Sequence, residues 1–128
     1  METSNDKNAE NRKAILATAA ILALLTVIVF VNAFKNDFVG YDDQNLIVGN
    51  ESIRSLSPSD VARMFLPKHR GNYQPLRTFS YAIDYAIWDM KPFGFQLANV
   101  ILHVLTVIGV WLLARKLIPD PAALVAAL

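Results

Sequence analysis

Residues 14–34 have the sequence AILATAAILALLTVIVFVNAF, a stretch of 21 residues without a charged side chain. As an α-helix this stretch would be about 31 Å long, which matches the hydrocarbon core of a bilayer. Apolar residues fall on every side of such a helix, unlike the single apolar face of a helix on a soluble protein. We therefore predict a first transmembrane helix here. A secretory signal peptide is the alternative, because Val31-Asn32-Ala33 could serve as a cleavage site, but the run exceeds the usual apolar core of about 7–15 residues.

Residues 92–114 form a second uncharged run, 23 residues long, which ends at Arg115-Lys116. This run is also long enough to span a bilayer, and we predict a second transmembrane helix over residues 92–118. Four polar side chains recur in it at intervals of three, four and three residues, so they share one helix face. Polar groups are costly in hydrocarbon and usually face a helix bundle or a cavity, which predicts a polar stripe of Gln96, Asn99, His103 and Thr106. Hydrogen bonding between helices is the simplest role for the stripe, and chemistry by His103 is the alternative.

The composition agrees with a membrane protein. Of 128 residues, 54% are hydrophobic and 18% are charged, which is more apolar and less charged than a typical soluble domain. The net charge of +1 gives no basic field of the kind that nucleic-acid-binding proteins use, and we expect no nucleic-acid partner. The absence of cysteine excludes a disulfide framework and a thiolate metal site.

The two ends of the chain differ from the apolar runs. Residues 1–13 are polar, and we predict a disordered cytoplasmic tail. Residues 119–128 read as a turn followed by the start of a third transmembrane helix. Because that last apolar run covers only seven residues, we expect the chain to be a truncated, N-terminal piece of a larger membrane protein.

Basic residues beside the apolar runs predict the orientation. The two ends that must share one side of the membrane carry Arg12, Lys13, Arg115 and Lys116. Such residues favour the cytoplasmic side. We therefore expect residues 35–91 to form an extracytoplasmic loop on the periplasmic or lumenal side, in a bacterial inner membrane or the endoplasmic reticulum membrane.

The loop contains two predicted helices, near residues 58–66 and near residues 74–90. The first would be capped by Ser57 or Ser59, and the second has Pro75 in its first turn. The second helix has an apolar and a polar stripe, which is typical of a helix on a membrane surface or of an amphipathic helix packed in a soluble core. Between two spans we favour the membrane surface. The predicted fold is thus an all-α integral membrane protein, with two transmembrane helices joined by an extracytoplasmic loop that carries two membrane-surface helices.

Candidate functional residues lie in this loop. The adjacent carboxylates Asp42 and Asp43 are either turn and cap residues or part of an acidic site at the membrane surface. Basic side chains in the same loop could bind a phosphate group: Arg77, Arg70 and Lys68. For Arg77, pairing with Asp84 or with lipid headgroups is the alternative, and for the other two it is a solvated turn.

Three stretches together resemble one family. They are GYDDQNLIVGNESIRSLS at residues 40–57, NYQPLRTFSYAIDYAIWDMKPFGFQLANVILH at residues 72–103, and ARKL at residues 114–117. The chain resembles, over about residues 30–118, the N-terminal region of the transmembrane, TPR-containing O-mannosyltransferase-like proteins of the glycosyltransferase C superfamily. The family often has Arg where this chain has Gln74, and Arg77 lies one helical turn further on.

The resemblance implies a multispanning enzyme that takes a sugar from a lipid-linked phosphosugar. Asp42 and Asp43 match the family's acidic motif, with Asp42 expected as the base and Asp43 as its support. Transfer from a polyprenyl phosphate needs a carboxylate for the acceptor's proton and cations for the departing phosphate. We expect no cofactor, since the donor is a substrate and adjacent aspartates alone are poor evidence for a divalent metal.

Two hypotheses for function follow. The first is the N-terminal part of a membrane glycosyltransferase that moves a mannose-like sugar from a polyprenyl-phosphate donor to a hydroxyl of an acceptor protein. Residues 1–128 alone are expected to be inactive. The second is a non-enzymatic membrane module that binds a partner or lipid headgroups through its amphipathic loop helices.

Overall fold

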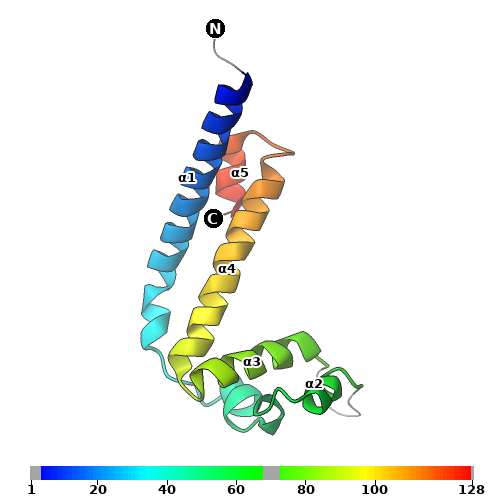
Figure 1. Ribbon diagram of the computed structural model, residues 1–128. Helices are drawn as coiled ribbons and strands as arrows, with labels where there is room; N and C mark the ends of the chain where they lie inside the picture. The colour runs from blue at the N-terminus through cyan, green and yellow to red at the C-terminus, as the bar shows by residue number, and fades with distance from the viewer. Residues whose placement is uncertain (1–3, 68–72, 128) are drawn as a thin grey trace. The chain divides into compact units, whose positions relative to one another are not determined.

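The computed structural model describes residues 4–67 and 73–127, and within these ranges the chain is helical and contains no β-strand (Figure 1). The all-helical prediction is confirmed. Short helices connect the longer ones, and the complete order is α1 (Ser4–Phe30), η1 (Val31–Lys35), η2 (Gln44–Val48), η3 (Glu51–Ile53), α2 (Pro58–Met64), α3 (Pro75–Trp88), α4 (Pro92–Ala114) and α5 (Asp120–Ala127).

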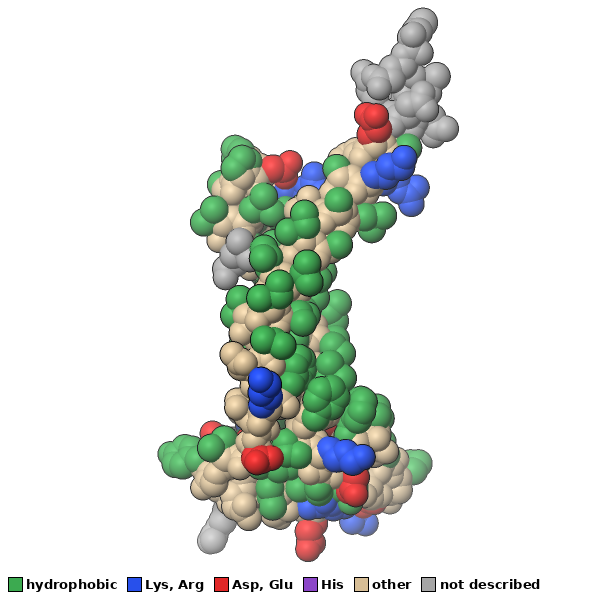
Figure 2. Space-filling view, turned by 90° about the vertical axis from the view of Figure 1, so that its left-hand side faces the viewer, with side chains coloured by type: hydrophobic (Ala, Val, Ile, Leu, Met, Phe, Trp, Pro, Cys, Tyr) green, Lys and Arg blue, Asp and Glu red, His purple; other side chains and the backbone are tan. Residues whose placement is uncertain are grey.

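Two helical stretches are long and apolar enough to cross a membrane, Asn8–Lys35 and Pro92–Ala114. Only 11% and 17% of their most apolar windows are buried within the protein. The large apolar side chains of α1 and α4 are therefore mostly exposed, and Figure 2 shows hydrophobic side chains along these helices. Contact with lipid is the usual reason for a continuous apolar surface along two long helices. The prediction of two candidate spans is confirmed.

The helix ends differ from the predicted boundaries. Helix α1 begins at Ser4, so residues 4–13 are helical where the sequence predicted a disordered tail. Adding residues to an existing helix costs little, and Ala, Glu, Arg and Lys in this segment have high helix propensity. Helix α4 ends at Ala114, and residues 115–118 form a closing turn in which the Leu117 N–H donates to the Ala114 carbonyl at 2.8 Å.

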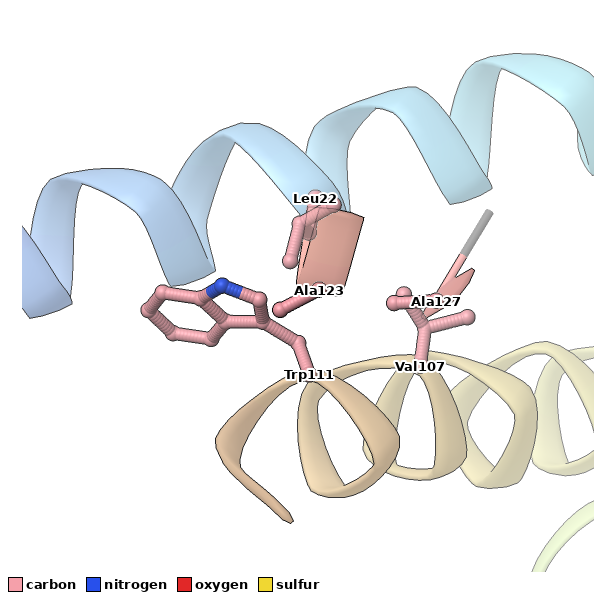
Figure 3. Close-up of a cluster of buried hydrophobic side chains, with 5 residues drawn as sticks. All are labelled: Leu22, Val107, Trp111, Ala123 and Ala127. Atoms are coloured by element: carbon pink, nitrogen blue, oxygen red, sulfur yellow. The ribbon is translucent and has the colours of Figure 1, made fainter. Parts of the chain in front are cut away.

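The chain divides into two compact units. The first unit comprises Met1–Asn32 and Asn99–Leu128, and thus contains α1, most of α4 and α5. Its core is a cluster from these three helices, drawn in Figure 3: Leu22, Val107, Trp111, Ala123 and Ala127. The alanines of α5 are small enough to let that helix approach the large Trp111 side chain closely.

The second unit is Ala33–Ala98. Its core brings together residues of five different elements: Ile47, Ile53, Met64, Ala82 and Phe95. Helix α2 begins after Ser57, whose hydroxyl accepts a hydrogen bond from the Asp60 N–H at 3.2 Å, so the N-cap is Ser57 and not Ser59. The Tyr73 hydroxyl donates to the Phe65 carbonyl at 2.8 Å and ties the segment before α3 to the end of α2.

Helix α3 buries only part of its apolar side in this core. Ala82 and Asp84 are buried, whereas Leu76 is 72% exposed and Ile87 is 64% exposed. Much of the apolar side of α3 is therefore outside the core of the second unit, although Phe79 packs against that core together with Tyr81 and Tyr85. Helix α3 thus leaves several large apolar side chains uncovered by its own unit.

Candidate functional site

Asp42 and Asp43 follow η1 and stand at the start of η2. The Asp43 carboxylate accepts a hydrogen bond from the Val39 N–H at 2.9 Å, and its backbone is already helical (φ −61°, ψ −33°). Asp42 is exposed, and no hydrogen bond or ion pair of its side chain occurs within residues 8–67 and 73–127. Asp43 thus stabilises the turn, and Asp42 presents its carboxylate to the surroundings.

Aromatic packing holds this turn beside α3. The Phe38 ring meets the Phe95 ring edge-on with centroids 5.4 Å apart, and Phe95 contacts Tyr81 of α3 at 5.9 Å. Edge-to-face aromatic pairs of this kind stabilise a contact beyond the area that they bury. The segment before the two aspartates and the Tyr81 ring therefore pack against the same side chain, Phe95.

Burial and several charged groups affect the pKa of Tyr81. Burial raises the pKa of Tyr81, the nearby positive charge of Arg77 lowers it, and the negative charges of Asp43, Asp84 and Asp42 raise it further. The overall pKa of Tyr81 is raised, so the phenol stays protonated at neutral pH and can donate a hydrogen bond.

Tyr81 and Asp84 are the residues that the sequence prediction missed. Both lie on the α3 face that carries Arg77, at the helical spacing i, i+4 and i+7. Asp84 is only 8% exposed, and burial raises the pKa of its carboxyl group. Within the described ranges no ion pair links Arg77 to Asp84, and pairing of Arg77 with lipid headgroups stays a prediction. The spacing from Arg77 was the signal that could have identified both residues.

The other cations have different positions. Lys68 and Arg70 lie outside the described residues. Arg54 was not predicted, and its guanidinium donates to the Val48 carbonyl at 2.7 Å and lies over the Tyr85 ring at 4.6 Å. These contacts make Arg54 a structural residue that joins η2 to α3.

The predicted polar stripe on α4 follows one helix face, but its residues have few partners. Gln96 is half-buried, while Asn99, His103 and Thr106 are exposed. The Thr106 hydroxyl donates to the Leu102 carbonyl of its own helix at 2.8 Å. The His103 ring meets the Phe30 ring edge-on at 4.9 Å.

A cavity of about 390 Å³ in the second unit is lined by none of the predicted site residues. Its lining includes Asp60, which pairs with Arg63 at 3.3 Å and accepts a hydrogen bond from the Ser57 hydroxyl at 2.6 Å. The hydroxyls of Ser57 and Ser55 lower the pKa of Asp60. These contacts stabilise the beginning of α2. In the part of the chain described, no three His, Asp or Glu side chains are arranged to hold a metal ion.

Comparisons with known proteins bear on this site. The chain is 29% identical over 120 residues to Protein O-mannosyl-transferase Tmtc1 of Drosophila melanogaster, which covers 88% of this chain and 14% of that protein. It is 24% identical over 107 residues to a protein O-mannosyl-transferase of Caenorhabditis elegans, covering 76% of this chain and 15% of that protein. The predicted family resemblance is confirmed. No family model and no solved structure matches the chain.

The chain therefore spans about one seventh of the length of these two O-mannosyl-transferase relatives. Their names support a glycosyltransferase-like role, and with two helices that can cross a bilayer they indicate a membrane protein. The matched stretch includes most of the chain and so extends well beyond either apolar helix alone.

Proposed function

We propose that the chain supplies part of the active site of a membrane glycosyltransferase that moves a mannose-like sugar from a polyprenyl-phosphate donor to a hydroxyl of an acceptor protein. The observation that carries the proposal is an exposed carboxylate, Asp42, in a turn whose Phe38 packs on the Phe95 ring, against which Tyr81 also packs. Tyr81 lies one helical turn after Arg77, and the chain is similar to two proteins named O-mannosyl-transferase. Carboxylates for a proton and a guanidinium for a phosphate are the two kinds of group that this transfer needs.

In the proposed reaction Asp42 is the general base. Its exposed carboxylate takes the proton of the acceptor hydroxyl as that oxygen attacks the first carbon of the sugar. The bond between this carbon and the phosphate oxygen breaks, and polyprenyl phosphate leaves with the bonding electrons. The half-buried Arg77 pairs with the phosphate, since a guanidinium binds phosphate through two parallel hydrogen bonds.

The neighbouring groups support these two. Asp43 is already committed to the Val39 N–H and holds the turn that presents Asp42. Tyr81, protonated at neutral pH, is a hydrogen-bond donor to the phosphate or to the acceptor oxygen. This assignment uses no cofactor, since the lipid-linked sugar is itself the substrate.

We place α3 on the membrane surface at the extracytoplasmic side. The exposure of Leu76, Ile83 and Ile87 supports this placement, because an apolar stripe that its own unit does not cover suits the boundary of the lipid. The four basic residues at the other ends of the spans support a cytoplasmic location for those ends, and hence a lumenal or periplasmic site.

The test replaces the matched segment of the Drosophila relative with this chain and measures mannose transfer from a polyprenyl-phosphate donor to an acceptor protein in membranes. Asp42→Asn should lower the rate of transfer by about 10²- to 10⁴-fold, the contribution of a positioned general base. Asp37→Asn is the matched control, since Asp37 is an exposed carboxylate of the same loop and should leave the rate unchanged. Full transfer by the Asp42→Asn protein would rule out the assigned base.

A further inference from the structure

The first unit contains two cavities that share the side chain of Arg115. One has a volume of about 170 Å³ and is lined by α1, α4 and α5, and the other has about 490 Å³ and is lined by α1 and the end of α4. Asn11, Ile15 and Arg115 line both cavities. None of these residues belongs to the site around Tyr81, and no part of the proposed transfer uses them.

The three helices contribute residues at helical spacing. Helix α1 provides Asn11, Ile15 and Thr18, one above the other on a single face. Helix α4 provides Trp111, and Arg115 follows directly after the end of α4. The lining of the smaller cavity is thus mixed, with polar side chains and the Trp111 ring. The larger cavity adds an apolar wall at Leu112 and a second cation at Lys116.

Arg115 is held in place at the boundary of the apolar span. Its side chain is only 21% exposed, its Nε lies 3.4 Å from the Asp120 carboxylate, and its guanidinium carbon lies 5.0 Å from the centre of the Trp111 ring. The pair with Asp120 engages one edge of the guanidinium. No hydrogen bond engages its two terminal nitrogens within residues 8–67 and 73–127, and these nitrogens form the edge that suits a phosphate.

The indole of Trp111 adds an unpaired donor. Trp111 is 3% exposed, and its Nε1 is a buried polar atom without a hydrogen-bond partner in the described part of the chain. Figure 3 shows this nitrogen on the side of the ring that faces α1. Buried donors normally have an acceptor, so an unpaired one beside a cavity indicates that an acceptor is missing.

The charge around the cavities is positive. Arg115 and Lys116 line them, and Asp120 neutralises one of these charges, which leaves an excess of one. Arg12 and Lys13 follow Asn11 directly in the sequence. Basic pockets at the ends of transmembrane helices are typical sites for anionic lipid headgroups.

We propose that these two cavities form one binding site for an anionic phospholipid, with the phosphate at Arg115 and Lys116 and an acyl chain along Leu112 and Leu113. The apolar wall beside the cations favours a membrane lipid over free phosphate, because a free ion would gain nothing from the leucines. The unpaired N–H of Trp111, which lines the smaller cavity, is a further donor for a headgroup oxygen. The site is independent of the glycosyltransferase function and lies in the other unit.

The test uses the whole chain in bilayer nanodiscs and quenching of Trp111 fluorescence by brominated lipid. Trp88→Phe leaves Trp111 as the one tryptophan in the sequence. A small fraction of brominated phosphatidylglycerol in phosphatidylcholine should quench Trp111 more than the same fraction of brominated phosphatidylcholine. Arg115→Gln and Lys116→Gln should each reduce this preference about fivefold, which corresponds to about 1 kcal/mol for each cation.

Lys13→Gln is the matched control, because Lys13 lies between the lining residues Asn11 and Ile15 in the sequence but itself lines neither cavity. The preference should survive in this variant, and Arg115→Lys should keep part of it. Equal quenching by the two brominated lipids would overturn the proposal. An equal loss of the preference in Lys13→Gln would show general attraction to the charged surface and no lipid site. Displacement of the lipid by inorganic phosphate would show that the cavities bind a free anion and not a phospholipid.

Discussion

The two adjacent aspartates should behave differently when each is replaced by alanine. Asp43 accepts one hydrogen bond, from the Val39 N–H at 2.9 Å, and this bond closes the turn before η2. Asp42 is exposed and makes no such contact within the described ranges. Asp43→Ala should therefore loosen the turn, and Asp42→Ala should leave the structure of the turn unchanged.

The expected change in local stability follows from the one hydrogen bond that Asp43→Ala removes. A hydrogen bond to a charged acceptor contributes about 1.5–3 kcal/mol when it is shielded and less when it is exposed, so about 1 kcal/mol is expected at this exposed position. A change of about 1 kcal/mol in the free energy of local opening speeds amide exchange about fivefold. The Asp42→Ala variant should stay within about 0.5 kcal/mol of the parent, which is typical of a surface substitution.

Hydrogen exchange measured by NMR on the labelled chain in nanodiscs tests this difference at a single amide. The Val39 N–H should exchange about fivefold faster in Asp43→Ala than in the parent, while the amides of the α1 span keep their rates. Unchanged exchange of Val39 in Asp43→Ala would refute the reasoning. An equal acceleration in Asp42→Ala would do so as well, because the structure gives that side chain no part in the turn.

Three further predictions concern the second unit. Ile53→Ala should destabilise it by about 2–5 kcal/mol, because Ile53 is completely buried, and chemical unfolding followed by circular dichroism would measure the loss; a cost below about 1 kcal/mol would contradict its place in the core. Burial raises the pKa of Asp84, because the folded protein disfavours the charged carboxylate. The protonated carboxyl therefore contributes to stability below its ordinary pKa, and this contribution is lost as the pH rises through the raised pKa. Asp84→Asn should thus stabilise the unit at neutral pH and give no gain in strong acid, and thermal unfolding at several pH values would measure both. A gain of equal size at every pH would show that the charge of Asp84 is not the cause. Gly94→Ala would place a methyl group against the Trp88 side chain and should cost about 1–3 kcal/mol with a shift in tryptophan emission, whereas an unaltered spectrum would show that the Trp88 ring is elsewhere.

The helices of this chain were largely predictable, and their tertiary faces were not. The apolar runs predicted α1 and α4, since a length of about 20 uncharged residues is a property of the local sequence alone. Ser57 and Pro75 marked the beginnings of α2 and α3 for the same local reason. The beginning of α1 at Ser4 was not predicted. A helix that is already formed extends easily into adjacent residues, so residues 4–13 are helical although they are polar.

The candidate site was predicted only in part. Asp42, Asp43 and Arg77 were identified from residue type and from the family resemblance, but nothing in the sequence showed that Phe38, just before the aspartates, and Tyr81, one helical turn after Arg77, pack against the same ring of Phe95. That arrangement depends on Phe38, Phe95 and Tyr81, which come from three segments and meet only when the unit folds.

The sequence by itself determined where the chain can cross a membrane and where its loop helices begin, because apolar length and capping are read from consecutive residues. Only the tertiary structure decided that Tyr81 and Asp84 face inward while Leu76 and Ile87 stay outside. Helical spacing defines two faces of α3, but which face is buried depends on the partners that Ile53, Met64 and Phe95 provide from distant positions.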